Sequence, residues 1–130
     1  MRTLSTIRKF RLSDSFVEPY KTAEVPWGPL GYVTFKRTYA RRLSESEPGA
    51  KGTEEWWQTC RRVVEGMFHI QKEHVVRLGL EWNDNKAQKT AKDAYERLFN
   101  LKWTPPGRGL WMMGTKFVEE RTGAALFNCA

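Results

Sequence analysis

The two cysteines and two histidines of this 130-residue chain are candidates for nucleophiles, redox groups or metal ligands. Cys60 falls within an apolar stripe at helical spacing, which predicts a small core residue and not a nucleophile. His69 and His74 are five positions apart, a spacing that places them on different sides of a helix, so we expect structural or surface histidines. Cys129 lies at the end of an apolar run, and its residue type alone leaves open a small apolar role or thiol chemistry.

The segment that would position this last cysteine runs from Trp103 to the end of the chain and is rich in turn signals. The adjacent Pro105 and Pro106 forbid a helix from continuing past this point. Four glycines separate short apolar runs: Gly107, Gly109, Gly114 and Gly123. Because glycine allows backbone conformations that other residues avoid, the pattern predicts a tight loop, a short apolar segment over 110–113, a second turn and a strand over 124–130.

Two amphipathic helices are predicted ahead of this segment, and we expect their apolar stripes to pack together as a core. Residues 53–68 begin with Thr53, a capping residue, and repeat apolar side chains at three- and four-residue steps. Residues 86–101 repeat in the same way behind a cap at Asn83 or Asp84. The inward side chains of this second helix are predicted to be Ala87, Ala91, Ala94, Leu98 and Leu101.

The first part of the chain is predicted to be less regular. Residues 1–12 are basic and predict a flexible arm or a short strand, with a partly disordered tail favoured. A short helix should follow, because Ser13 or Asp14 can cap it. Residues 25–31 contain two prolines and two glycines and predict a rigid, turn-rich connector.

Residues 32–39 alternate β-branched and aromatic side chains with polar ones, which predicts a strand or extended segment. Residues 44–52 predict a polar loop and are the best candidate for a linker. The densest basic cluster begins in the first of these segments and ends just before the second, and it favours a solvated face over a phosphate site: Lys36, Arg37, Arg41 and Arg42.

Basic residues outnumber acidic ones by 22 to 15, which gives a net charge of +7. This excess either favours an anionic partner or keeps an aromatic-rich domain in solution. Two cysteines do not form a disulfide framework, which favours a reducing cytoplasm. No apolar run is long enough for a signal peptide or a membrane span, so we expect a cytoplasmic protein with no membrane partner.

Three blocks in this chain resemble monomeric class II, adenosylcobalamin-dependent ribonucleotide reductases. They are W-G-x-L-G-x-V-T-x-K-R-T-Y-A-R at 27–41, R-V-V-E-G at 62–66, and T-P-x-G-R-x-L-W-x-x-G-T at 104–115, the last followed by R-T-G and N-C. The resemblance implies a mainly helical N-terminal region with short strands over 1–102. It further implies that 103–130 form the loop and first strand of a ten-stranded α/β barrel that is otherwise absent.

The resemblance also implies roles for individual residues. Cys129 matches one of the cysteine pair that reduces the substrate, and neither its partner nor the family's radical-bearing cysteine has a match in this chain. Thr104 matches a Thr-Pro turn that contacts substrate phosphates, a task that suits a hydroxyl and free loop amides. Asn128 matches a position that lines the substrate pocket. Arg108 is a weaker candidate, because its charge could simply anchor the loop.

The implied activity is reduction of ribonucleoside triphosphates by thiyl-radical chemistry, with adenosylcobalamin bound outside this chain. The implied partners are the ribonucleotide, the remainder of the catalytic barrel in cis or as a separate chain, and a dithiol reductant such as thioredoxin. Two alternatives remain at this point: a small basic nucleic-acid-binding module, and a structural subunit that only docks to a separate barrel.

Overall fold

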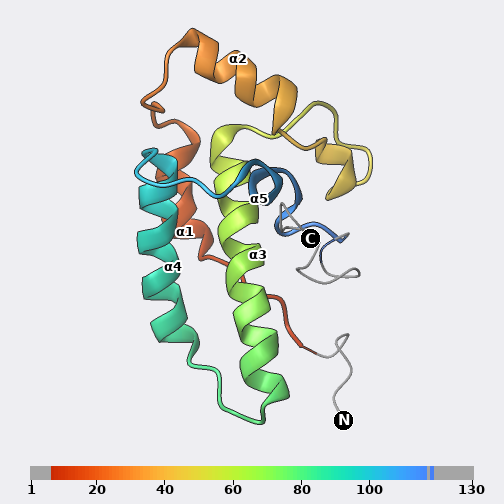
Figure 1. Ribbon diagram of the computed structural model, residues 1–130, viewed down its shortest axis with the longest axis vertical. Helices are drawn as coiled ribbons and strands as arrows, with labels where there is room; N and C mark the ends of the chain where they lie inside the picture. Colours follow the sequence, from red (N-terminus) through yellow and green to blue (C-terminus); the bar gives the residue numbers. More distant parts are fainter. Residues whose placement is uncertain (1–6, 117, 119–130) are drawn as a thin grey trace.

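The computed structural model describes residues 7–116 and 118, and over these residues the protein is built from helices (Figure 1). The elements in chain order are α1 (Asp14–Val17), the 3-10 helix η2 (Glu18–Lys21), α2 (Pro29–Thr38), the 3-10 helix η3 (Leu43–Glu45), α3 (Trp56–Arg77), α4 (Asp84–Phe99) and α5 (Gly107–Met112). The mainly helical region is therefore confirmed. The short strands expected in this region are wrong, because the only β-pairing within the described residues is one isolated antiparallel bridge, between Arg42 and Thr53.

The two long helices, α3 and α4, run side by side and are joined by a short turn (Figure 1). The prediction of a helix at 53–68 is confirmed in type but not in its limits. Glu55 caps α3 in place of Thr53, because the side chains of Glu55 and Gln58 each accept a hydrogen bond from the other residue's backbone amide. The helix then continues to Arg77, with Gly79 just beyond it at a φ of +75°.

The prediction for α4 is closer to the structure. Asn83 caps the helix by accepting from the backbone amide of Lys86 at 3.1 Å. Ala87, Ala91 and Leu98 are buried as expected, and so are Tyr95 and Phe99, which the expected stripe did not include. Leu101 is a wrong assignment, because the helix has ended by then and this residue has a φ of +60° and is 37% exposed.

The N-terminal segment is part of the core, so the flexible arm predicted for 1–12 is wrong over residues 7–12. Phe10 and Leu12 are 1% and 2% exposed, and the ring of Phe10 stacks on Phe68 of α3 with centroids 5.3 Å apart. The main core side chains, all buried in one cluster, are Phe10, Leu12, Val17, Phe35, Trp56, Cys60, Val63, Val64, Phe68, Ala91, Tyr95, Leu98 and Phe99.

Polar contacts with α3 fix the register of this segment. The Leu12 amide donates to Oε2 of Glu65 at 2.9 Å, and Arg61 Nη2 donates to the Leu12 carbonyl at 3.0 Å. The Phe10 amide donates to Nδ1 of His69 at 3.4 Å. Buried backbone groups without partners are costly, so these bonds allow an irregular segment to pack inside the core.

The strand predicted over 32–39 is wrong, because these residues belong to α2. Pro29 occupies the first turn of the helix, where its fixed φ suits helical geometry and its missing N–H costs nothing. Phe35 is 3% exposed and packs on the rings of Trp27 and Trp56, with centroids 5.4 and 5.3 Å away. Tertiary packing of this one ring outweighs the β-propensity of its neighbours. The connector predicted over 25–31 is therefore shorter, since its last three residues are helical.

The loop at 44–52 does not link two domains. Its two ends are held together, since the Leu43 amide donates to the Gly52 carbonyl at 3.0 Å and the Glu54 amide donates to the Arg41 carbonyl at 2.8 Å. Elements before and after the loop contribute to the same core. None of the described helices combines the length and the hydropathy that crossing a bilayer requires.

Candidate functional site

The segment 103–115 carries the predicted functional loop and is held against the helical pair at both ends. At its start, Trp103 Nε1 donates to the carbonyl of Ala94 on α4 at 3.1 Å. Further on, α5 forms immediately after Pro106, and its Leu110 is buried. The apolar segment predicted over 110–113 thus lies largely in α5, which packs against α3 (Figure 1).

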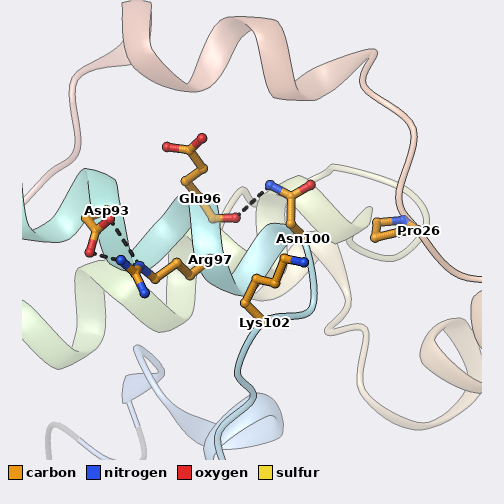
Figure 2. A pocket seen from close by; sticks show the side chains of 6 residues that line it. All are labelled: Pro26, Asp93, Glu96, Arg97, Asn100 and Lys102. Carbon is orange, nitrogen blue, oxygen red and sulfur yellow. Dashed lines mark hydrogen bonds and ion pairs between the residues drawn. The ribbon is translucent and has the colours of Figure 1, made fainter.

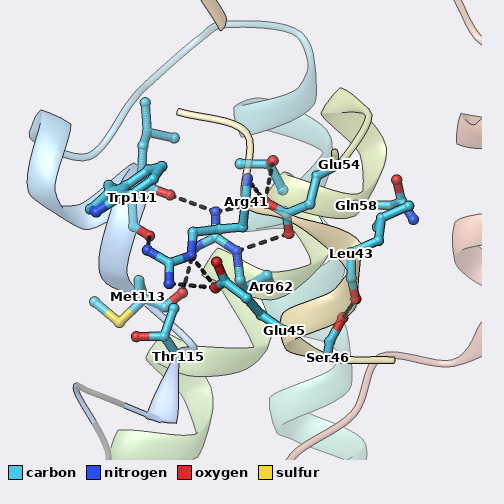
Figure 3. Close-up of polar contacts among 12 residues, drawn as sticks. Arg41, Leu43, Glu45, Ser46, Glu54, Gln58, Arg62, Trp111, Met113 and Thr115 are labelled. Carbon is cyan, nitrogen blue, oxygen red and sulfur yellow. Dashed lines mark hydrogen bonds and ion pairs between the residues drawn. The ribbon is translucent and has the colours of Figure 1, made fainter. Parts of the chain in front are cut away.

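Arg62 of α3 binds the carbonyls at the end of α5. Its Nη2 donates to the Leu110 carbonyl and its Nη1 to the Met113 carbonyl, both at 2.7 Å (Figure 3). The same guanidinium is paired with Glu54, through Nε to Oε2 at 2.9 Å and Nη2 to Oε1 at 3.0 Å. Only an arginine fork can serve a carboxylate and two carbonyls in this fixed geometry.

The Arg62–Glu54 pair is largely removed from water, with side chains 13% and 9% exposed. The carboxylate of Glu54 is nevertheless well satisfied, because its Oε1 also accepts from the Arg41 amide at 2.8 Å and from the Thr59 hydroxyl at 3.1 Å. A buried ion pair is tolerated only with such additional hydrogen bonds. Losing either partner would leave the other charge buried and uncompensated.

Arg41 provides a second contact to the same segment. Its guanidinium lies over the Trp111 ring at 4.4 Å from the centroid and donates to the Trp111 carbonyl at 3.4 Å. Glu45 accepts from this guanidinium through Oε2 (Figure 3). Lys36, another member of the basic cluster, donates to the carbonyls of residues 53 and 54 at 3.3 and 3.0 Å. These two members of the cluster therefore support the structure, so the predicted solvated face is wrong for Lys36 and Arg41.

Two glycines allow α3 and the end of the segment to approach closely. A Cβ on Gly66 would lie 2.5 Å from the backbone nitrogen of Gly114, and a Cβ on Gly114 would lie 2.4 Å from the carbonyl oxygen of Arg62. Gly114 also has a φ of +78°, which other residues rarely adopt. Both positions therefore require glycine.

The structure places one of the three predicted site residues. Thr104 is exposed and lies in the non-helical stretch between the Trp103 anchor and α5. Arg108, the weaker candidate, is exposed on the first turn of α5. Cys129 and Asn128 lie outside the described residues, and so does the strand predicted over 124–130.

Sequence reasoning missed the importance of Arg62 and Glu54. Arg62 is not part of the apolar stripe of α3, and α5 covers the side of the helix on which it lies. The one sequence signal for Arg62 was its place in the R-V-V-E-G block at 62–66. Neither residue type nor periodicity shows which segment packs against this arginine.

The other chemistry-bearing residues have structural roles. Cys60 is fully buried, and burial raises the pKa of its thiol well above the usual value, so it is an inert core residue as predicted. His69 is buried, and its Nε2 lies 3.1 Å from Glu73 Oε1, while His74 is exposed. Among residues 7–116 and 118, no group of three His, Cys, Asp or Glu side chains could hold a metal ion.

A hollow of about 460 Å³ lies beside the C-terminal end of α4 and is lined by Pro26, Asp93, Glu96, Arg97, Asn100 and Lys102 (Figure 2). Some of its polar groups contact one another, since Arg97 Nε donates to Asp93 at 3.2 Å and Asn100 Nδ2 donates to the Glu96 carbonyl at 2.9 Å. Binding sites combine apolar walls with a few convergent polar groups, whereas Pro26 is the one apolar residue that lines this hollow.

Comparison with known proteins identifies the relatives of this fold. Residues 12–115 match the family model described as the ribonucleotide reductase alpha domain. The chain is 41% identical to a probable adenosylcobalamin-dependent ribonucleoside-triphosphate reductase of Dictyostelium discoideum, over 96% of this chain and 16% of that protein. It is 38% identical to the adenosylcobalamin-dependent ribonucleoside-triphosphate reductase of Euglena gracilis, over 98% of this chain and 17% of that protein.

A solved structure agrees with these relatives. The crystal structure of a B12-dependent, class II ribonucleotide reductase superposes with a TM-score of 0.74 and 36% identity, over 92% of this chain and 16% of that one. The chain thus spans about a sixth of the length of the proteins it matches. The family match, the shared sequence and the shared fold cover the same helical region. The chain belongs to the ribonucleotide reductase alpha domain family.

Proposed function

We propose that this chain is the N-terminal part of a ribonucleotide reductase that reduces ribonucleoside triphosphates to deoxyribonucleotides. The observation that carries the proposal is the family match over 12–115, supported by a similar fold in a class II reductase. Residues 103–130 would enter the catalytic domain, and the helical residues before them would support that entry. The remainder of the barrel, in cis or as a separate chain, is the partner that completes the enzyme.

Within this proposal Cys129 supplies one of two reducing thiols. The ribose loses its 2′-hydroxyl as water and gains hydrogen, while the two thiols give up two electrons and two protons and become a disulfide. An external dithiol such as thioredoxin then reduces that disulfide. Thr104 would contact the substrate phosphates, and Asn128 would line the pocket. Thr104 is exposed and follows Trp103, which is anchored to α4. Its hydroxyl is therefore accessible, which supports this role.

The proposal includes adenosylcobalamin as the cofactor of the whole enzyme, because the relatives are named for their dependence on it. The described residues do not fit this group. The hollow beside α4 is lined mostly by charged side chains, of which Arg97 and Asp93 are paired with each other, and such a lining does not suit a large corrin ring. We therefore assign no cofactor contact to this chain and expect no reductase activity from residues 1–130 alone.

A chimera tests the proposed function directly. Residues 1–130 would replace the matching part of the Lacticaseibacillus paracasei reductase, to which the chain is 41% identical over 123 residues. We expect this chimera to form deoxyribonucleotides from ribonucleoside triphosphates with adenosylcobalamin and a dithiol. Cys129→Ser should preserve assembly but abolish sustained turnover, because a hydroxyl cannot form a disulfide.

Cys60→Ala is the matched control, since Cys60 is the other cysteine of the chain and is buried in the core. It should leave turnover unchanged. Full multiple-turnover activity in Cys129→Ser would show that this thiol is not a reductant. A chimera that assembles but forms no deoxyribonucleotide would refute the proposed function as a whole.

A nucleic-acid-binding module is less favoured by the described residues. Such modules stack bases on exposed aromatic rings. Here the rings of Phe10, Phe35, Trp56, Tyr95 and Phe99 are buried in the core, while of the two exposed rings, Tyr32 and Trp111, that of Trp111 is covered by the Arg41 guanidinium.

A further inference from the structure

We infer that the Arg62–Glu54 pair is a positioning device that sets the location of the segment 103–115, and with it the orientation of Thr104 toward the substrate phosphates. The part that concerns Thr104 rests on the proposed function. The part that concerns the segment rests on the contacts of described residues alone.

Besides the Arg62–Glu54 pair, the segment is held by the buried Leu110, by the Trp103 anchor and by the contact of Arg41 with Trp111. Between the Trp103 anchor on α4 and the Arg62 contacts on α3 it forms only the short helix α5. So short a helix is not stable by its own hydrogen bonds and needs tertiary contacts. Arg62 provides them at the helix C-terminal end, where its cation binds the Leu110 and Met113 carbonyls that have no partner within the helix.

The pair also makes this contact rigid. Glu54 orients the guanidinium through two hydrogen bonds and is itself held by the Arg41 amide and the Thr59 hydroxyl. The planar fork thus has a single orientation. The close approach of Gly66 and Gly114 brings the segment near enough to meet it. Arg62 thereby fixes the carbonyls of Leu110 and Met113 relative to α3. Because Trp103 is bound to α4, the loop between Trp103 and α5 is held at both of its ends.

The decisive variant is Arg62→Lys, which keeps the positive charge beside Glu54 but cannot bind the carboxylate and both carbonyls together. The matched control is Arg77→Lys, the same change on the same helix at a residue whose side chain is 53% exposed. Glu54→Gln is the second variant: it keeps the shape of the acceptor and removes its charge.

The first measurement is hydrogen exchange in the 130-residue chain. The Leu110 and Met113 amides bond within α5, to the carbonyls of Pro106 and Gly109. In Arg62→Lys and Glu54→Gln we expect them to exchange at least about tenfold faster while the amides of α4 keep their protection. Unchanged exchange at Leu110 and Met113 in both variants would overturn the inference, whatever the enzyme does.

The second measurement uses the chimeric reductase described above. A displaced phosphate loop weakens substrate binding throughout the reaction, so KM for the ribonucleoside triphosphate should rise about tenfold with kcat nearly unchanged. Arg77→Lys should change neither. Faster exchange with an unchanged KM would overturn the role toward the substrate. An assembled but inactive wild-type chimera would refute the proposed function, and with it that role, while the exchange result still decides whether the pair positions the segment.

Discussion

The two sides of α3 are built on different principles. Toward α4 and the N-terminal segment it presents large apolar side chains such as Val63, Val64 and Phe68, which interlock with aromatic rings. Toward α5 it presents Arg62 and Gly66, which make a buried ion pair, carbonyl contacts and a close backbone approach. The first side is stabilised by burial of apolar area, and the second by a few hydrogen bonds, an ion pair and a backbone contact that require fixed positions.

This difference predicts different responses to substitution. Apolar packing is spread over many contacts, and volume-conserving changes disturb it little. The α5 side depends on a few atoms at fixed places, so small changes there should detach α5 and leave the α3–α4 pair folded. The following experiments test that distinction.

The largest effect should come from Val64→Asp on the apolar side. Val64 is fully buried, and an unpaired carboxylate there should destabilise the fold by more than about 4 kcal/mol and unfold α3 and α4 together. Circular dichroism melting would measure it. Ile70→Asp, at a residue of the same helix that is 42% exposed, is the control and should cost less than about 1 kcal/mol. An unchanged melting curve for Val64→Asp would show that this side is not a core.

Gly66→Ala should have the next largest effect, with a different character. The new methyl would overlap the Gly114 backbone and force α5 away, at a cost of about 1–3 kcal/mol. We expect rapid exchange of the α5 amides with only a modest loss of helicity elsewhere. Gly28→Ala, where a Cβ meets nothing within 4 Å, is the control. Global unfolding by Gly66→Ala would mean that the two sides are not separable.

Tyr95→Phe tests a single polar link on the apolar side. The Tyr95 hydroxyl donates to the Trp57 carbonyl at 3.0 Å, and burial raises the pKa of this phenol, so it remains a donor. Its loss should cost about 1 kcal/mol in urea unfolding and leave α5 in place. Tyr32→Phe, on the exposed part of α2, should be nearly neutral. A detached α5 in Tyr95→Phe would contradict the independence of the two sides.

The smallest effect should be the pH dependence that Glu65 contributes. Burial raises the pKa of Glu65 above the unfolded value near 4.5, although Arg61 opposes the shift. The stability that this group contributes is therefore full below that value and is lost as pH rises through the folded pKa. Glu65→Gln cannot ionise, so it should gain stability relative to wild type over this window. Urea unfolding at a series of pH values would test this, and a constant difference would contradict it.

The sequence predicted the apolar side of α3 better than the side that faces α5. The α3 and α4 helices, their packing and the buried Cys60 were predicted, because helical periodicity and caps are local signals. The strand predicted over 32–39 was wrong, since Trp27 and Trp56 stabilise Phe35 in a helix. For the candidate site, the sequence indicated Thr104 and the loop around it, but not Arg62 or Glu54 as the residues that hold the loop.

By itself, the sequence determined which segments are amphipathic helices and which blocks resemble the reductases, because both depend on residues a few positions apart. The tertiary structure decided the burial of Phe10 and Leu12 and the contact of Arg62 with α5. The Leu12–Glu65 bond spans 53 residues of sequence, and the bonds from Arg62 to Leu110 and Met113 span 48 and 51. Whether an arginine is solvated or paired inside the protein depends on which distant backbone covers it, and only the folded chain brings that backbone near.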